Sequence, residues 1–220
     1  MENSTSIYTI LGYISAFSTL IPFIFGIVFY RNSETTLRIA TILFGLGLFT
    51  EIFCRIYATF INPNNIWLFN VYQLIETILI SAIYYTWFKN KLLRYALLIF
   101  CSLFIVIAVN EQISSGTKTL NSLSLSIESI AVILFSFITF FLFLKESLQV
   151  NILSVPFFWF NTAFLIYFTC NIFLHLFSQY LQEHALYTFY ELWGLWHSLS
   201  NITFYTLISI GFWKTRKSQI

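Results

Sequence analysis

The stretch LLIFCSLFIVIAV, Leu97–Val109, decides the fold class of this chain. It contains no charged residue, and it lacks the alternating polar residues of a transmembrane β-strand. A helix satisfies its own backbone hydrogen bonds in lipid, so the stretch predicts a membrane-spanning helix. The whole chain agrees: 9% of its 220 residues are charged and its mean hydropathy is +0.79, whereas soluble domains carry about 25% charged residues. We therefore expect an all-α integral membrane protein.

Seven stretches approach the length that a membrane-spanning helix needs. The hydrocarbon core is about 30 Å thick, which takes about 20 mainly apolar residues. The seven predicted spans are Tyr8–Tyr30, Ile39–Phe60, Ile66–Phe88, Leu92–Val109, Leu123–Leu144, Val155–Ser178 and Tyr187–Trp213. The fourth is the shortest, and the longest connection is Asn110–Ser122. This pattern predicts a single seven-transmembrane-helix bundle over residues 1–220, without a soluble domain.

The basic residues predict the orientation of the bundle, because Lys and Arg are enriched in cytoplasmic loops. Nine of the 11 lie in the first, third and fifth connections and in the C-terminal tail, namely Arg31, Arg38, Lys89, Lys91, Arg94, Lys145, Lys214, Arg216 and Lys217. Lys118 lies on the other side, and Arg55 lies within the second span. We expect the N-terminus outside, the C-terminus in the cytoplasm, and a location in a bacterial inner (cytoplasmic) membrane.

Two short similarities raise the hypothesis of an internal duplication. Phe53–Tyr57 (FCRIY) in the second span resembles Thr169–Phe173 (TCNIF) in the sixth. The third and seventh spans also end alike, in Trp-Phe-Lys at residues 87–89 and Phe-Trp-Lys at residues 212–214. The chain would then be two parallel triplets of helices joined by the fourth helix. Internal repeats are frequent in transporters, with binding sites at the repeat interface.

Polar residues within the spans are the candidates for a functional site. A charge at the centre of a bilayer costs about 2.5–3.5 kcal/mol on insertion scales, so such residues turn inward and find partners. The predicted ligand-binding or proton-relay residues are Glu51, Arg55, Glu76, Glu128, Asn171, His175, Glu191, Trp193, His197 and Asn201. With the predicted orientation, most of them fall in the outer half of the membrane. The first and fourth spans carry few polar residues, so we expect them at the periphery.

A purely structural role is the alternative for several of these residues. Polar side chains join membrane helices by hydrogen bonds worth about 0.6 kcal/mol on average in one measured case. Glu51 and Arg55 have the four-residue spacing of an intrahelical ion pair. Four Glu within the spans against one Arg are harder to explain by structure alone. Some of these Glu should be protonated, or should meet His175, His197 or an external cation.

Several chemistries fit the sequence poorly. The scattered basic residues give no nucleic-acid footprint. The topology is similar to that of rhodopsins and G-protein-coupled receptors, but the last span lacks a mid-membrane Lys for retinal. SWEET-type sugar transporters are similar in topology, but their proline-glutamine signature is absent. A zinc hydrolase using His175, His197 and a Glu remains a minor alternative to a non-enzymatic role, and we expect no cofactor and no metal.

Two main functional hypotheses follow, and a third is a further alternative. The first is a sensor or receptor-like subunit, which binds a small ligand or a partner helix in an outward-biased polar pocket and signals through a separate membrane or cytoplasmic protein. The second is a small-solute or proton-coupled transporter, because His changes its charge near neutral pH and suits a proton relay. The third is a structural subunit of a membrane complex.

Overall fold

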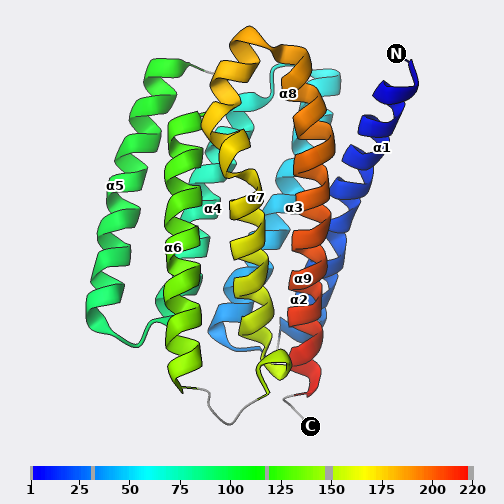
Figure 1. Cartoon of the computed structure of the whole chain (residues 1–220). Helices are drawn as coiled ribbons and strands as arrows, with labels where there is room; N and C mark the ends of the chain where they lie inside the picture. Colours follow the sequence, from blue (N-terminus) through cyan, green and yellow to red (C-terminus); the bar gives the residue numbers. More distant parts are fainter. Residues whose placement is uncertain (1, 31–32, 117–118, 147–150, 218–220) are drawn as a thin grey trace.

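The chain is an all-helical bundle of long apolar helices. The structure is a computed structural model that describes residues 2–30, 33–116, 119–146 and 151–217, and these ranges contain no β-strand. Six helical stretches in them are long and apolar enough to cross a membrane, which indicates a multi-pass membrane protein. The elements (Figure 1) are α1 (Glu2–Ser18), α2 (Leu20–Phe29), α3 (Thr35–Phe60), α4 (Ile66–Trp87), α5 (Lys91–Ser115), α6 (Ser122–Glu146), η2 (Ile152–Ser154), α7 (Pro156–His184), α8 (Leu186–Leu192), η3 (Trp193–His197) and α9 (Ser198–Lys217).

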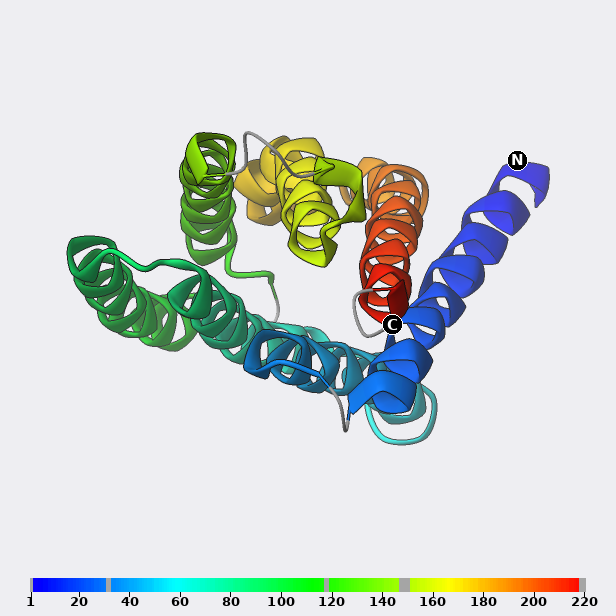
Figure 2. The same cartoon turned by 90° about the horizontal axis from the view of Figure 1, so that it is seen from below.

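The helices pack around α7, which lies between α6 and α9. On the other side of the bundle α3 and α4 pack against each other, and α2 packs against both α3 and α9. Figure 2 shows α5 at one edge of the bundle, where it contacts α4 and α6, as expected for the fourth span. The same view shows α1 leaning away from the bundle toward its N-terminus. It packs mainly against α9, η3 and α2.

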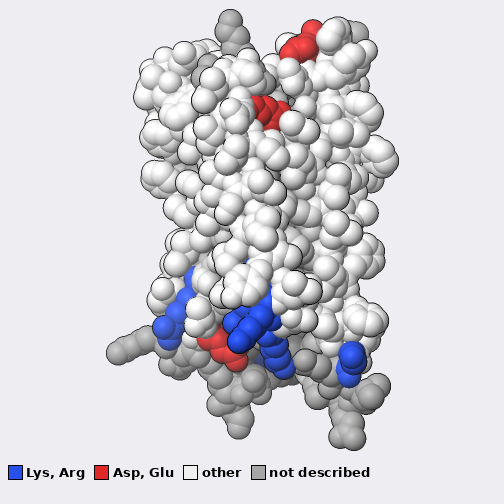
Figure 3. All heavy atoms as spheres, turned by 90° about the vertical axis from the view of Figure 1, so that its left-hand side faces the viewer, with Lys and Arg blue, Asp and Glu red and all other residues white. Residues whose placement is uncertain are grey.

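Basic side chains gather at the end of the bundle where α3 begins and α9 ends. This basic end is drawn at the bottom of Figure 3, and its described members are Arg38, Lys89, Lys91, Arg94, Lys145 and Lys214. Arg31 and Lys118, and the side chains of Arg216 and Lys217, lie outside the described part of the chain. The N-terminus lies at the opposite end from the C-terminus (Figure 1).

Four predicted spans differ from the observed helices. The first is divided at Thr19 into α1 and α2, close to Pro22, whose ring and missing N–H disfavour an uninterrupted helix. The sixth continues as α7 to His184, a residue that the sequence placed in a loop. The seventh consists of α8, the π-helical turn η3 and α9. The fourth, predicted as the shortest, is the 25-residue helix α5.

Local side chains explain where several helices begin. The Asn90 side chain accepts a hydrogen bond from Leu92 N at 2.8 Å and caps α5. Pro156 occupies the first turn of α7, where its missing N–H costs nothing. The buried carboxylate of Glu111 on α5 caps α6, accepting from Leu123 N at 2.9 Å and from Ser124 N at 2.8 Å. It thereby ties the last turns of α5 to the first turn of α6.

A polar network closes the bundle at the end opposite the basic end. Asn70 on α4 is its centre and is 4% exposed. The Asn70 amide donates to Gln112 Oε1 at 2.9 Å and to Thr119 O at 3.1 Å, and its Oδ1 accepts from Asn121 N at 3.2 Å. These bonds join α4 to the end of α5 and to the segment before α6, and Asn70 also lines the cavity described below.

The apolar core fills the half of the bundle next to the basic end. It is largely aromatic, and its largest fully buried members are Tyr84, Phe88, Phe160, Phe164 and Phe212. These residues come from the end of α4, the beginning of α7 and the second half of α9, all of which meet at the basic end. A small polar cluster interrupts this core: the Asn161 amide donates to Ser136 O at 3.0 Å, and Tyr84 OH lies 2.7 Å from Ser136 Oγ. The other half of the bundle is packed around polar side chains instead.

Replacing Gly211 by alanine should destabilise the core. An added Cβ would lie 2.6 Å from the ring of Phe160, which is itself fully buried against Phe212 with ring centroids 5.0 Å apart. We expect the free energy of unfolding in mixed micelles to fall by about 1–3 kcal/mol, as for other overpacked cores. Gly12→Ala is the matched control, since nothing lies within 4 Å of its added Cβ. Equal stability of the two variants would contradict this packing.

Candidate functional site

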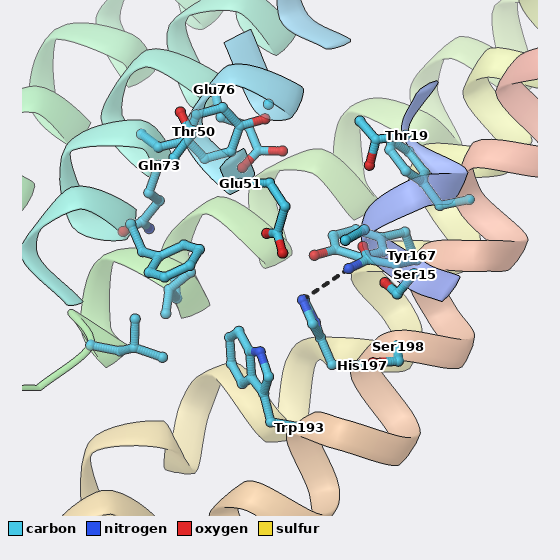
Figure 4. Close-up of a pocket in the computed structure, with 18 of the residues that line it drawn as sticks. Ser15, Thr19, Thr50, Glu51, Gln73, Glu76, Tyr167, Trp193, His197 and Ser198 are labelled. Atoms are coloured by element: carbon cyan, nitrogen blue, oxygen red, sulfur yellow. Dashed lines mark hydrogen bonds between the residues drawn. The ribbon is translucent and has the colours of Figure 1, made fainter. Parts of the chain in front are cut away.

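A cavity of about 260 Å³ lies in the half of the bundle away from the basic end. Its walls come from α1, α3, α4, α6, α7, η3 and α9 (Figure 4). Eight of the ten predicted site residues line it, namely Glu51, Arg55, Glu76, Glu128, His175, Trp193, His197 and Asn201. The structure therefore brings together polar residues that are up to 150 positions apart in the sequence.

Two predicted residues do not line this cavity. Asn171 is fully buried behind its wall, where its amide donates to Tyr167 O at 2.8 Å. Glu191 lies on α8, and its carboxylate accepts from Tyr8 OH on α1 at 3.4 Å. Asn171 is thus a neighbour of the cavity residues, while Glu191 joins α8 to α1.

Glu51 and Arg55 form the expected ion pair on α3. Arg55 donates to Glu51 Oε1 through Nη2 at 2.7 Å and through Nε at 3.0 Å. The guanidinium also reaches α1, where Nη2 lies 3.4 Å from Gly12 O and the charge sits 4.8 Å from the ring centroid of Tyr13. Arg55 therefore neutralises Glu51 and links α3 to α1 across the cavity wall.

Glu128 and Glu76 are the two other carboxyl groups of the cavity. Glu128 on α6 is 1% exposed and accepts from Thr77 Oγ1 at 2.6 Å. Glu76 on α4 lies close enough to Glu128 for a repulsive electrostatic interaction. Within the described residues Glu76 has no hydrogen bond or ion pair to its carboxyl group. Figure 4 shows Glu76 and Glu51 projecting into the same space.

His197 is held by a chain of amide groups that defines its tautomer. Asn201 Nδ2 is 3.1 Å from His197 Nε2 and can only donate, so Nε2 is the acceptor. His197 Nδ1 therefore carries the proton and faces Asn171 Oδ1 at 3.4 Å. The orientation of Asn171 is fixed in turn by its bond to Tyr167 O. Trp193 stacks on the imidazole with centroids 4.2 Å apart. His197 is thus a neutral, fully bonded part of the wall in this structure.

His175 is anchored differently. Ser129 Oγ donates to Leu125 O at 2.7 Å, so its single proton is used. The 2.8 Å contact between Ser129 Oγ and His175 Nδ1 then requires Nδ1 to donate. This leaves Nε2 of His175 as an acceptor on a side chain that lines the cavity.

Helix α1 supplies a wall that the sequence reasoning missed. The first span was expected at the periphery with little contribution to the site. It does lie at an edge of the bundle (Figure 2), but Gly12, Ser15, Ala16 and Thr19 line the cavity. They share one face of α1 at spacings of three and four residues, and this stripe of small side chains was the available signal. Small residues let helices approach closely in membranes.

Tyrosines and the π-helical turn were also missed. Tyr72, Tyr167 and Tyr205 line the cavity beside Trp193. The turn η3 adds a residue to the helical register, a feature frequent at functional sites. At Gly194 the backbone of this turn approaches α1, where an added Cβ would lie 2.9 Å from Tyr8 Cβ. In a chain this rich in aromatic residues, the sequence does not distinguish a tyrosine that lines the cavity from one that packs in the apolar core.

Fold and cavity together define a multi-pass helical membrane protein with a polar site inside the bundle. Comparisons with protein-family models, curated proteins and solved structures find no match to this chain. The chemical argument therefore depends on the cavity itself. Three Glu against one Arg give its lining an excess of acidic groups, which favours a proton or a cation there.

Proposed function

We propose that this chain is a membrane sensor or receptor-like subunit that binds a small ligand in the cavity. The observation that carries the proposal is the convergence of polar side chains from separate helices on one internal space, with the carboxyl group of Glu76 left unpaired by the described residues. Intramembrane ionisable groups are costly, and their retention favours a function. The cavity is large enough for a small molecule and too small for a partner helix.

The position of the cavity supports binding from the outside. The aromatic core lies between the cavity and the basic end, and it contains residues such as Phe164 and Phe212 that are fully buried. Lys and Arg are enriched on the cytoplasmic side of membrane proteins. If the basic end faces the cytoplasm, a ligand enters the cavity from the extracytoplasmic side. The basic end is then the surface available to a separate signalling partner.

A cysteine in the cavity wall tests this proposal. Thr50 lines the cavity and is half-buried on α3. Thr50→Cys, in a background with Cys54, Cys101 and Cys170 replaced by alanine, should react with membrane-impermeant thiol reagents added outside intact cells. The same cysteine should stay unreactive in inside-out vesicles. If neither side gives a reaction, the cavity is closed to solutes, and a structural subunit becomes the better account.

A transporter is the second candidate, because the last predicted span contains a π-helical turn at the cavity. This turn, Trp193–His197, supplies Trp193, Gly194 and His197 to the lining and packs against α1. Internal repeats are frequent in transporters, with binding sites at the repeat interface, and the similar segments at 53–57 and 169–173 suit a duplication. Reaction of Thr50→Cys from both sides of the membrane would favour this alternative over a sensor.

A further inference from the structure

We infer that the ligand of this cavity is a small organic cation, a substituted ammonium compound held between Glu76 and an aromatic wall. The inference rests on the proposed function, since it presumes that the cavity is a binding site. It concerns the chemical class of the ligand, which the proposal above leaves open.

The charges of the lining call for a cation. Arg55 is the only Lys or Arg among the lining residues, and it is already paired with Glu51 at 2.7 Å. Glu76 and Glu128 remain without a basic partner among these residues, and they repel each other. His197 does not supply a positive charge to these carboxylates, because its two ring nitrogens are bonded to Asn171 and Asn201 in the neutral form. A ligand with one positive charge would compensate the unpaired carboxylate.

The surroundings of Glu76 suit an organic cation better than a metal ion. The described residues contain no cluster of three or more His, Cys, Asp or Glu arranged to hold a metal. The cavity instead presents seven aromatic side chains, of which four are Trp or Tyr: Trp193, Tyr72, Tyr167 and Tyr205. Ammonium groups bind to aromatic faces, with Trp and Tyr the favoured partners. An acidic group opposite aromatic rings therefore matches a substituted ammonium ion.

The amide of Gln73 belongs to the wall beside Glu128. Gln73 is 4% exposed, and its side chain interacts with the carboxyl group of Glu128. Glu128 also accepts from Thr77 Oγ1, so Glu76 is the carboxyl group left for a ligand. Choline is a small substituted ammonium ion and serves as the probe.

Charged thiol reagents test the inference on the intact chain. Thr50→Cys is treated from outside with the trimethylammonium-ethyl and the sulfonatoethyl methanethiosulfonates, which are cationic and anionic. Each rate is divided by the rate at Leu186→Cys, a 51% exposed position on α8 outside the cavity. We expect the normalised preference for the cationic reagent to be at least about tenfold, since an unpaired carboxylate lining the same cavity acts oppositely on the two charges.

The isosteric variant Glu76→Gln assigns this preference to one residue. It should remove most of the preference for the cationic reagent. Glu183→Gln is the matched control, because Glu183 is exposed, bonds to Gln179 on its own helix and lies outside the cavity. It should leave the preference unchanged. Equal normalised rates for both reagents would contradict a cationic ligand but would leave the cavity accessible as a binding site. No reaction with either reagent would contradict the proposed function itself.

Equilibrium protection gives a second measurement. Choline should slow the modification of Thr50→Cys with an apparent Kd of about 1 mM or tighter. Its neutral isostere 3,3-dimethylbutan-1-ol should not. Equal protection by the neutral compound, or none by choline and tetramethylammonium, would contradict the inference.

Discussion

Replacing Asn70 by leucine is expected to lower the free energy of unfolding by about 2–6 kcal/mol. Leucine fills a similar volume but leaves the partly buried carbonyl of Thr119 and the buried N–H of Asn121 without partners, since both bond to Asn70 at 3.1 and 3.2 Å. Each such loss costs about 1–3 kcal/mol. Equilibrium unfolding of the purified chain in mixed micelles measures the effect.

Asn110→Leu is the control for this prediction. Asn110 is exposed on α5, and its amide donates to Val106 O of the same helix at 2.9 Å. We expect its unfolding free energy to change by less than about 0.5 kcal/mol, as at most surface positions. A similar loss in both variants would mean that the network around Asn70 does not hold the connection between α5 and α6.

Replacing Ser15 by leucine is expected to block the cavity. Ser15 is 6% exposed on α1, and Figure 4 shows it at the cavity wall near His197. The larger side chain would occupy space that the ligand and the thiol reagents need. The rate at which Thr50→Cys reacts from outside should therefore fall at least about tenfold, equivalent to about 1.4 kcal/mol or more.

Ser18→Leu, three residues after Ser15 on the same helix, is the control for Ser15→Leu. Ser18 lies on α1, does not line the cavity and donates to Ser15 O at 2.6 Å. Ser18→Leu should leave the reaction of Thr50→Cys within about twofold of its parent, as expected for a change outside the site. If Ser18→Leu blocked the reaction as strongly as Ser15→Leu, the effect would come from displacement of α1 and not from filling the cavity.

The helical class and the inward-facing polar residues were predictable because both follow from the low solubility of charge in lipid. Glu51, Glu76 and Glu128 had to turn away from the acyl chains, and they line one cavity. The pairing of Glu51 with Arg55 followed from a spacing of four residues.

Features that depend on uncharged residues or on backbone register could not be predicted in the same way. Ser15 and Thr19 line the cavity, but such small side chains are tolerated facing lipid as well as facing the bundle interior, so the sequence does not reveal their position. The π-helical turn at Trp193–His197 lies where Gly194 meets Tyr8 of α1, a contact between distant segments that no local pattern predicts. The neutral state assigned to His197 depends on amide partners from two helices, and no local pattern identifies these.

A density map of the intact chain in lipid nanodiscs with choline present tests the central claim most directly. The account predicts a water-filled cavity inside the bundle, in the half of the membrane away from the basic end. It also predicts density for choline between Glu76 and Trp193. Acyl chains filling that space, or the carboxyl groups of Glu51, Glu76 and Glu128 directed at lipid with no common cavity, would contradict it.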